Sequence, residues 1–301
     1  MSEHSSLGLD GVITALVTPF YKGEVDDRSF KRLLFNQLND GVDGVVVSGT
    51  TGESPTLRYN EIEKLFMMAK TEAGGKVPVL LGTGSNCTRH TIEMTQAAGR
   101  WGADAALVAT PYYNKPPQRG LLAHFTAVAE ASQIPIVLYD VPGRTITSIA
   151  VETVIALAKH PRIVGIKEAS GDLKRLDQIK ANVAADFTLL SGDDDTCVEF
   201  CRRGGQGVIS VVSHLMVPEL KEFLRRARGQ DPKAEQDFKK YQALLRAIYA
   251  ESNPIPIKAA LYLKGLIDSM EMRLPLVALA EEHLTNLKDE MQKLGMIGAH
   301  T

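Results

Sequence analysis

Short apolar runs alternate eight times with amphipathic segments of helical length, and this alternation limits the possible folds more than any other feature. The runs are almost continuously apolar, which is typical of strands buried on both faces of a parallel sheet. The segments between them carry apolar residues at the spacing of one helix face. The runs cover residues 12–18, 44–48, 77–81, 105–109, 136–139, 163–167, 187–190 and 208–212. The intervening segments cover residues 29–40, 61–73, 88–101, 121–132, 151–159, 173–184, 196–203 and 218–228.

Eight strand–helix units in succession predict an α/β fold, a closed (β/α)8 TIM barrel. An open doubly wound sheet is the alternative, but it usually has fewer strands and a dinucleotide-binding fingerprint after the first, which is missing here. Asp172 and Asp195 are expected to cap the sixth and seventh helices. After Arg228 only helical patterns follow, at 231–249, 256–266 and 276–294. We therefore expect a catalytic barrel over 1–228 and a C-terminal helical extension over 229–301 packed on it.

Composition excludes several classes of function. Lys plus Arg number 34 and Asp plus Glu 36, so the formal net charge is −2 and no basic nucleic-acid surface is indicated. No apolar run approaches the roughly 18 residues of a membrane span, and the N-terminus lacks the pattern of a secretory signal. The three Cys are too few and odd in number for a disulfide framework, which favours a reducing cytoplasm.

Functional groups of a TIM barrel lie where strands end, and two such positions stand out. Lys167 ends the sixth apolar run. Burial there would disfavour the ammonium form and leave a neutral amine that can attack a carbonyl to form a Schiff base. Tyr139 ends the fifth run, and its phenol could pass the protons that this chemistry requires. The alternatives are a Lys167 that reaches solvent or pairs with Glu168, and a Tyr139 whose hydroxyl is bound by a backbone group.

Three loops add candidate binding groups. Thr50 and Thr51 lie in a glycine-rich turn after the second run, which suits a small anion such as a carboxylate or a phosphate. Arg144 lies in a Pro-Gly-Arg turn just beyond Tyr139, where a guanidinium could bind a carboxylate through two hydrogen bonds; the alternative is a solvated loop arginine. The paired Tyr112 and Tyr113 form either a wall of the site or a subunit contact.

A metal centre is not expected. The run of three aspartates at 193–195 rarely faces a single point, and no pair of histidines has ligand spacing. Two broader alternatives remain open from these residues alone. One is a phosphate- or metal-dependent barrel enzyme that binds phosphate at Thr50 and Thr51, and the other is a non-catalytic barrel used for binding or assembly.

Seven motifs together resemble one family over nearly the whole chain. It is the dihydrodipicolinate synthase family, within the pyruvate-dependent class I aldolases that also include N-acetylneuraminate lyase. The motifs stand in the family's order and at the ends of the predicted strands. They are GTTGE at 49–53, TPYYN at 110–114, YDVPGRT at 139–145, GIKEA at 165–169, SGDD at 191–194, GVISV at 207–211 and NPIPIK at 253–258.

The resemblance implies a reaction and a role for each site residue. It implies that pyruvate condenses with aspartate 4-semialdehyde to give 4-hydroxy-tetrahydrodipicolinate, the first committed step toward diaminopimelate and lysine, with no cofactor. The enzymes concerned are commonly homotetramers built from two tight dimers. The implied role of Lys167 is to form the Schiff base, and Tyr139, Thr50 and a neighbouring subunit's Tyr113 would relay protons. Thr51, together with Thr50, would bind the pyruvate carboxylate, and Arg144 would bind the second substrate. Backbone groups near Gly192 and Ile209 would line the pocket.

Arg144 also distinguishes the nearest alternative. Sialic acid lyases and keto-deoxy sugar acid aldolases share the Lys and the Tyr, but they typically lack the Pro-Gly-Arg turn and bind a polyol there. The resemblance therefore favours a short acidic aldehyde over a sugar acid.

The sequence departs from the family at several positions. Asp140 and His214 stand where Asn is frequent. The pocket in which lysine inhibits some relatives matches at Ser54, Asn86 and Tyr112. It differs at a second set of positions, where lysine-sensitive enzymes of the best-known type carry His, His and Glu; these are Tyr59, Ile62 and His90. Because that Glu pairs with the ammonium of lysine, we expect feedback inhibition to be weak or absent.

Overall fold

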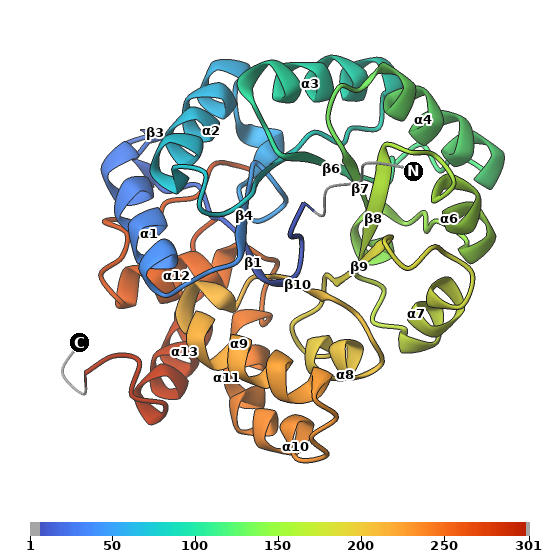
Figure 1. Ribbon diagram of the computed structural model, residues 1–301. Coiled ribbons are helices and arrows are strands. Elements are labelled where there is room, and N and C mark those ends of the chain that lie inside the picture. Colours follow the sequence, from blue (N-terminus) through green and yellow to red (C-terminus); the bar gives the residue numbers. More distant parts are fainter. Residues whose placement is uncertain (1–6, 299–301) are drawn as a thin grey trace.

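A computed structural model describes residues 7–298, and eight parallel strands in it form a closed barrel surrounded by helices (Figure 1). The prediction of a TIM barrel is confirmed. Neighbouring strands pair around the ring in the order β1-β10-β9-β8-β7-β6-β5-β4. The barrel strands are β1 Gly11–Ala15, β4 Gly44–Val47, β5 Val79–Gly82, β6 Ala105–Ala109, β7 Ile136–Asp140, β8 Ile163–Glu168, β9 Thr188–Ser191 and β10 Gly207–Ser210.

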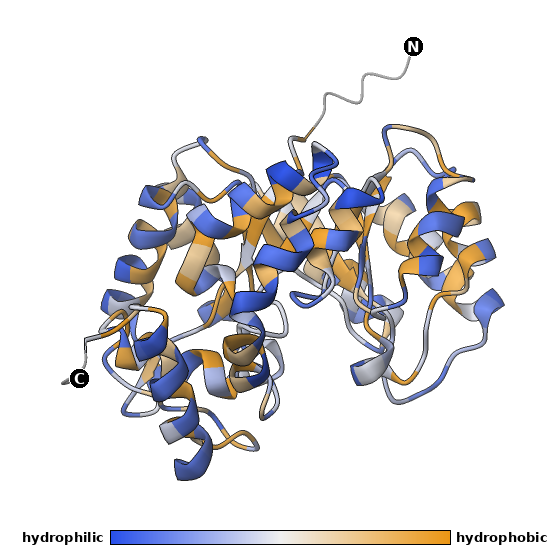
Figure 2. Ribbon diagram, turned by 90° about the horizontal axis from the view of Figure 1, so that it is seen from below, coloured by the Kyte–Doolittle hydropathy of each residue, from blue (hydrophilic) through white to orange (hydrophobic). Residues whose placement is uncertain are grey.

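Each predicted helix of the barrel is present, although α7 ends four residues earlier and α9 begins five residues earlier than predicted. The barrel helices are α1 Asp27–Asn39, α2 Tyr59–Ala73, α3 Thr88–Trp101, α4 Gln118–Ala131, α6 Val151–Leu157, α7 Leu173–Lys180, α8 Cys197–Arg202 and α9 Ser213–Arg228. Apolar residues lie on the strands and on the helix faces turned toward them (Figure 2). Burial of these faces between sheet and helices is the main favourable contribution to the stability of such a layer.

Helix capping confirms one prediction and corrects another. Asp172 accepts a hydrogen bond from the backbone of Lys174 and caps α7 as expected. Asp195 does not cap α8, because Thr196 holds the capping position. The side chain of Asp193 instead accepts hydrogen bonds from the backbone nitrogens of both Asp195 and Thr196. A sequence of three aspartates offers three competing acceptors, so spacing alone did not identify the one that the turn uses.

Several elements differ from their predicted bounds. The first strand ends at Ala15, and the chain then forms a short hairpin of β2 Phe20–Tyr21 and β3 Glu24–Val25. Thr18, which was predicted to belong to the first strand, lies outside it and donates a hydrogen bond to the carbonyl of Gly52. Two further short elements were not predicted, the helix α5 Pro142–Thr145 and the 3-10 turn η1 Ser54–Thr56.

The predicted helix at 231–249 is broken into three pieces, α10 Ala234–Phe238, the 3-10 turn η2 Lys239–Tyr241 and α11 Gln242–Ile248. The tighter turn lets Phe238 and Tyr241 both pack on Phe223 of α9, with ring centroids 5.3 and 5.9 Å away. Of the last two predicted helices, the first is α12 Ile255–Leu263. The second, α13 Glu281–Lys293, starts later than predicted.

The elements after Arg228 pack beside the barrel, near α8, α9 and α1 (Figure 1). The helix α12 lies against α9, α11 and α13, and most of its residues are buried. The segment that follows α12 reaches α1, where Arg32 bonds the carbonyl of Leu266 and the carboxylate of Asp268. No helix within residues 7–298 is both long and apolar enough to cross a membrane.

His214, one of the departures from the family, is fully buried at the start of α9. Its Nε2 accepts a hydrogen bond from the backbone of Val17 at 3.2 Å, and its Nδ1 lies 2.8 Å from the carbonyl of Val211. These contacts fit a neutral ring that donates from Nδ1. Burial lowers the pKa of His214 to about 4, because the charged ring would be poorly solvated there.

We predict that His214 makes the fold sensitive to acid. In the unfolded chain its pKa returns to about 6.5, so below that pH the unfolded state binds the additional proton. The contribution of His214 to stability is complete above pH 6.5 and is lost as the pH falls toward 4, by about 2 kcal/mol at pH 5. The variant H214N should therefore show a smaller fall in unfolding free energy between pH 7.5 and pH 5 than the unaltered protein. Equal falls in both proteins, measured by urea unfolding, would contradict this.

Candidate active site

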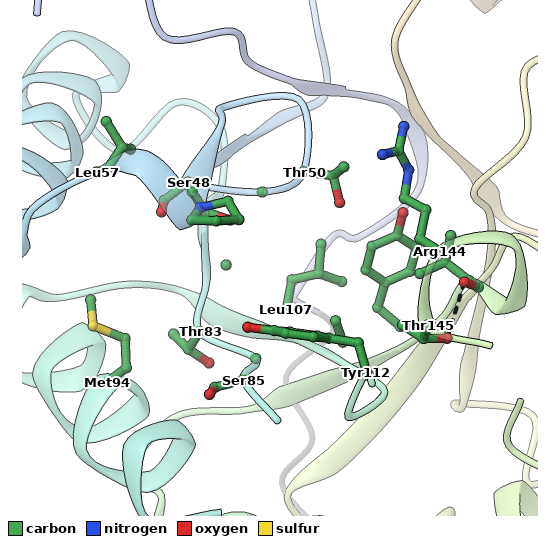
Figure 3. A pocket seen from close by; sticks show the side chains of 18 of the residues that line it. Ser48, Thr50, Leu57, Thr83, Ser85, Met94, Leu107, Tyr112, Arg144 and Thr145 are labelled. Carbon is green, nitrogen blue, oxygen red and sulfur yellow. Dashed lines mark hydrogen bonds between the residues drawn. The ribbon is translucent and has the colours of Figure 1, made fainter. Parts of the chain in front are cut away.

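A cavity of about 600 Å³ opens among the loops that follow β4, β5, β6 and β7. These loops leave the carboxyl ends of neighbouring parallel strands, where the sites of TIM barrels lie. Figure 3 shows Thr50 and Arg144 at one end of this cavity and Thr83 and Met94 at the other. Tyr112 lies between them.

Lys167 and Tyr139 lie side by side within the barrel. They are register partners on β8 and β7, so both side chains point to the same face of the sheet. The Nζ atom of Lys167 is 4.2 Å from the centroid of the Tyr139 ring. Lys167 is only 6% exposed, and within residues 7–298 its amine forms no salt bridge. Tyr139 lines the cavity, which places the amine next to it.

Glu168 is not a partner for Lys167, so that alternative is wrong. Successive side chains of a strand point to opposite faces, and Glu168 lies on the outer face with Asp140. Arg175 of α7 bridges the two carboxylates, with its Nε 2.9 Å from Glu168 and an Nη 2.8 Å from Asp140. Burial raises the pKa of Asp140 to about 6, with Arg175 opposing this shift. The bridge ties β7 to β8 directly behind the Lys167–Tyr139 pair.

Gly192 leaves room for the Lys167 side chain. A Cβ atom at position 192 would lie 2.8 Å from Cε of Lys167 and 2.6 Å from Cβ of Ala169. Such contacts are closer than a packed interior tolerates, so a larger residue would displace the lysine. Ile209 is buried within the barrel on β10 and does not line the cavity, and neither does Gly192.

Thr50 and Thr51 take different positions in their shared loop. Thr50 lines the cavity, whereas Thr51 is buried and accepts a hydrogen bond at 2.9 Å from Nδ2 of Asn253. Arg144, on α5, lines the cavity and donates a hydrogen bond to the backbone carbonyl of Asn253 at 3.0 Å. The structure therefore brings Thr50, Arg144 and Tyr139 to one cavity and links Thr51 to it through Asn253.

The paired tyrosines separate. Tyr112 lines the cavity, and Tyr113 does not. Tyr113 is 85% exposed and has a left-handed backbone with φ of 74°. An aromatic side chain so exposed makes little contact within its own subunit. Its place is compatible with a contact between subunits.

Of the residues predicted for a lysine pocket, some line the 600 Å³ cavity and others do not. Ser54, Ile62, His90 and Tyr112 all line the 600 Å³ cavity. Tyr59 instead packs on Trp101, with ring centroids 5.2 Å apart. Asn86 also lies outside the lining, and its backbone carbonyl accepts a hydrogen bond from the side chain of Asn114.

A buried ion pair was not predicted; it lies beneath the threonine loop, which comprises residues 49–53. Nζ of Lys258 lies 2.7 Å from Oε1 of Glu53, and both side chains are 0% exposed. Both residues belong to motifs named above, but nothing in the spacing indicated that segments about 200 positions apart would meet. Within residues 7–298, no three His, Cys, Asp or Glu side chains gather as metal ligands would.

Comparisons with known proteins agree with this geometry. The model of the Dihydrodipicolinate synthetase family matches residues 8–294. The 4-hydroxy-tetrahydrodipicolinate synthase of Bdellovibrio bacteriovorus is 49% identical over 288 residues, which are 95% of this chain and 98% of that protein.

Two solved structures share the fold across almost their whole length. The dihydrodipicolinate synthase of Thermotoga maritima superposes with a TM-score of 0.94 at 40% identity, covering 96% of this chain and 100% of that one. The enzyme of Cyanidioschyzon merolae, solved with lysine bound, gives 0.92 at 40% identity, covering 96% and 99%. With the family model matched over nearly all its length, this chain belongs to the dihydrodipicolinate synthetase family.

Proposed function

We propose that this protein is a lyase that condenses pyruvate with L-aspartate 4-semialdehyde to give 4-hydroxy-tetrahydrodipicolinate, through a Schiff base on Lys167. The observation that carries the proposal is the buried amine of Lys167, which lies against the ring of Tyr139 and has no carboxylate partner among residues 7–298. Relatives named for this reaction share nearly the whole chain.

The first half-reaction joins pyruvate to the protein. The neutral amine of Lys167 adds to the keto carbon, and loss of water from the carbinolamine gives an iminium ion. Tyr139 and Thr50 supply and remove the protons, with the partner subunit's Tyr113 completing the relay. Thr51 donates to the pyruvate carboxylate, with backbone groups near Gly192 and Ile209 lining the base of the site. Loss of a methyl proton then gives the nucleophilic enamine.

The second half-reaction builds the carbon skeleton and releases the lysine. The enamine carbon attacks the aldehyde carbon of the semialdehyde, and the resulting alkoxide takes a proton from the relay. The amino group of that substrate then adds to the imine carbon and displaces the amine of Lys167, which closes the ring. Arg144 holds the carboxylate of the second substrate during these steps, since a guanidinium binds a carboxylate through paired hydrogen bonds. The chemistry is supplied by the covalent imine, so no further cofactor is required.

The nearest alternative is a Schiff-base aldolase that acts on a keto-deoxy sugar acid or on sialic acid. Arg144 at the cavity favours the short acidic aldehyde over a polyol. Purified protein should form 4-hydroxy-tetrahydrodipicolinate from pyruvate and aspartate 4-semialdehyde. A coupled enzymatic reduction of that product measures its formation. Cleavage of N-acetylneuraminate or a keto-deoxy sugar acid, with no turnover of the semialdehyde, would instead establish the alternative.

The proposed function also leads to a proposed oligomeric state and a proposed cellular compartment. We infer a homotetramer of two tight dimers, supported by the exposed Tyr113 and by the need for a second copy to complete the proton relay. The balanced charge and the three unpaired cysteines fit a cytoplasmic enzyme of lysine and diaminopimelate synthesis.

We predict that free lysine inhibits this enzyme weakly or not at all. Among residues 7–298, no Asp or Glu lines the cavity that holds Ser54, His90 and Tyr112, so the ammonium of lysine would lose water without gaining an ion pair. Half-maximal inhibition should therefore need lysine well above about 1 mM. H90E should increase sensitivity by supplying the missing carboxylate. Strong inhibition of the unaltered enzyme below that concentration would show the prediction to be wrong.

A further inference from the structure

Asn253 connects the C-terminal extension to both proposed carboxylate-binding residues. It lies between α11 and α12 and is 8% exposed. Its side-chain Nδ2 donates to the hydroxyl of Thr51 at 2.9 Å, and its backbone carbonyl accepts from Nη2 of Arg144 at 3.0 Å. Thr51 follows β4 and Arg144 follows β7, so one residue from outside the barrel joins two loops that the barrel holds apart.

We propose that Asn253 is a positioning residue whose side chain sets the hydroxyl of Thr51 for the first substrate, while its backbone sets Arg144 for the second. This inference rests on the proposed function. It assigns to the C-terminal extension a part in substrate binding. A substitution at residue 253 can distinguish the two contacts. The contact with Thr51 depends on the side chain of residue 253, whereas the contact with Arg144 depends only on its backbone.

The direction of the Asn253–Thr51 hydrogen bond determines whether the Thr51 hydroxyl can donate to an anion. When Nδ2 of Asn253 donates, the hydroxyl oxygen of Thr51 accepts, and the hydroxyl hydrogen stays available for an anion. Within residues 7–298 the Thr51 hydroxyl takes part in no other hydrogen bond. A bound carboxylate could accept that hydrogen. The Oδ1 atom of Asn253 is buried and has no hydrogen-bond partner in the described part of the chain, so the amide carries an unmet acceptor.

The same chain segment anchors the threonine loop at a second point. Five residues after Asn253, Lys258 forms the buried ion pair with Glu53 and also donates to the carbonyl of Glu271 at 2.6 Å. The backbone nitrogen of Arg273 bonds the other oxygen of Glu53 at 3.1 Å. Because Glu53 is two residues from Thr51, these contacts fix the distance between the loop and Asn253. The side chain of Asn253 thus meets Thr51 from a rigid support.

The test measures the apparent affinity for pyruvate and the KM for the semialdehyde separately. In N253A the side-chain contact is lost and the backbone contact is kept. The pyruvate concentration for half-maximal borohydride trapping should rise about tenfold, while the KM for the semialdehyde stays within about twofold. In a T51V background, N253A should add almost nothing, because the partner of the amide is already gone. N182A, which changes an exposed asparagine in the turn after α7, should match the unaltered enzyme.

N253D keeps the shape of the side chain and carries the test if N253A does not fold. A carboxylate can only accept from Thr51, so it takes the hydroxyl hydrogen and places a negative charge beside the pyruvate carboxylate. Half-maximal trapping should then need about a hundredfold more pyruvate. Circular dichroism and the unfolding temperature identify variants that have lost their fold.

Distinct results would overturn distinct claims. Trapping by N253A and N253D at the pyruvate concentration of the unaltered enzyme would overturn the assignment of Asn253 alone. So would an equal rise for both substrates, or an N253A effect that persists in T51V. Failure of the unaltered enzyme to trap pyruvate at all would overturn the proposed function and this inference with it.

Discussion

Replacing Lys167 by Met is expected to lower kcat by at least about a thousandfold, with the fold intact. Methionine has similar length and is apolar, so the space beside Gly192 and against Tyr139 stays filled. It has no amine, so no imine forms and no enamine follows. K167R should be as inactive, because a guanidinium stays protonated and does not add to a carbonyl.

The matched control is K174M, an exposed lysine on α7 in the same strand–helix unit. It should retain full activity, measured by product formation at saturating pyruvate. Activity of K167M within about tenfold of the unaltered enzyme would mean that Lys167 does not carry the covalent intermediate.

Replacing Lys258 by Met is expected to cost about 3–5 kcal/mol of unfolding free energy, because it leaves the carboxylate of Glu53 buried without its partner. Burial lowers the pKa of Lys258, and Glu53 opposes that shift, so the charged pair is held together by mutual attraction in a dry site. E53Q should destabilise the fold by removing the same attraction. The double variant E53Q/K258M should be more stable than K258M, because no charge remains unpaired.

Lys293 on α13, whose side chain is exposed and pairs with Glu290, provides the comparison. K293M should leave the midpoint of urea unfolding unchanged, since solvent screens such pairs. A K258M protein as stable as K293M would show that the buried pair does not hold the threonine loop. Strict additivity of the two single effects in E53Q/K258M would show that the two groups do not interact.

The barrel could be predicted from the sequence because its strands are buried on both faces. The runs that contain β6 and β7 are continuously apolar, as is typical of strands covered on both faces in a parallel sheet. The Lys167–Tyr139 pair followed from one rule, that functional groups lie where barrel strands end, combined with motifs shared with a family. The register of β7 and β8 then placed the two side chains together.

Contacts between distant segments could not be predicted in this way. Asn253 and Lys258 stand in a motif that was noticed, but their partners Thr51 and Glu53 lie about 200 positions away, and periodicity carries no information at that range. The bridging role of Arg175 was missed for the same reason. The break in the helix at 231–249 depends on aromatic packing against α9, so it too is set by tertiary contacts rather than by local pattern.

The central claim is that Lys167 forms an imine with pyruvate, and trapping tests it most directly. Purified protein is incubated with pyruvate and sodium borohydride, digested, and mapped by mass spectrometry. We predict one reduced pyruvate adduct per chain, on the peptide that contains Lys167, and none in K167M. An adduct on another lysine, or no adduct while the protein still forms product, would contradict the account.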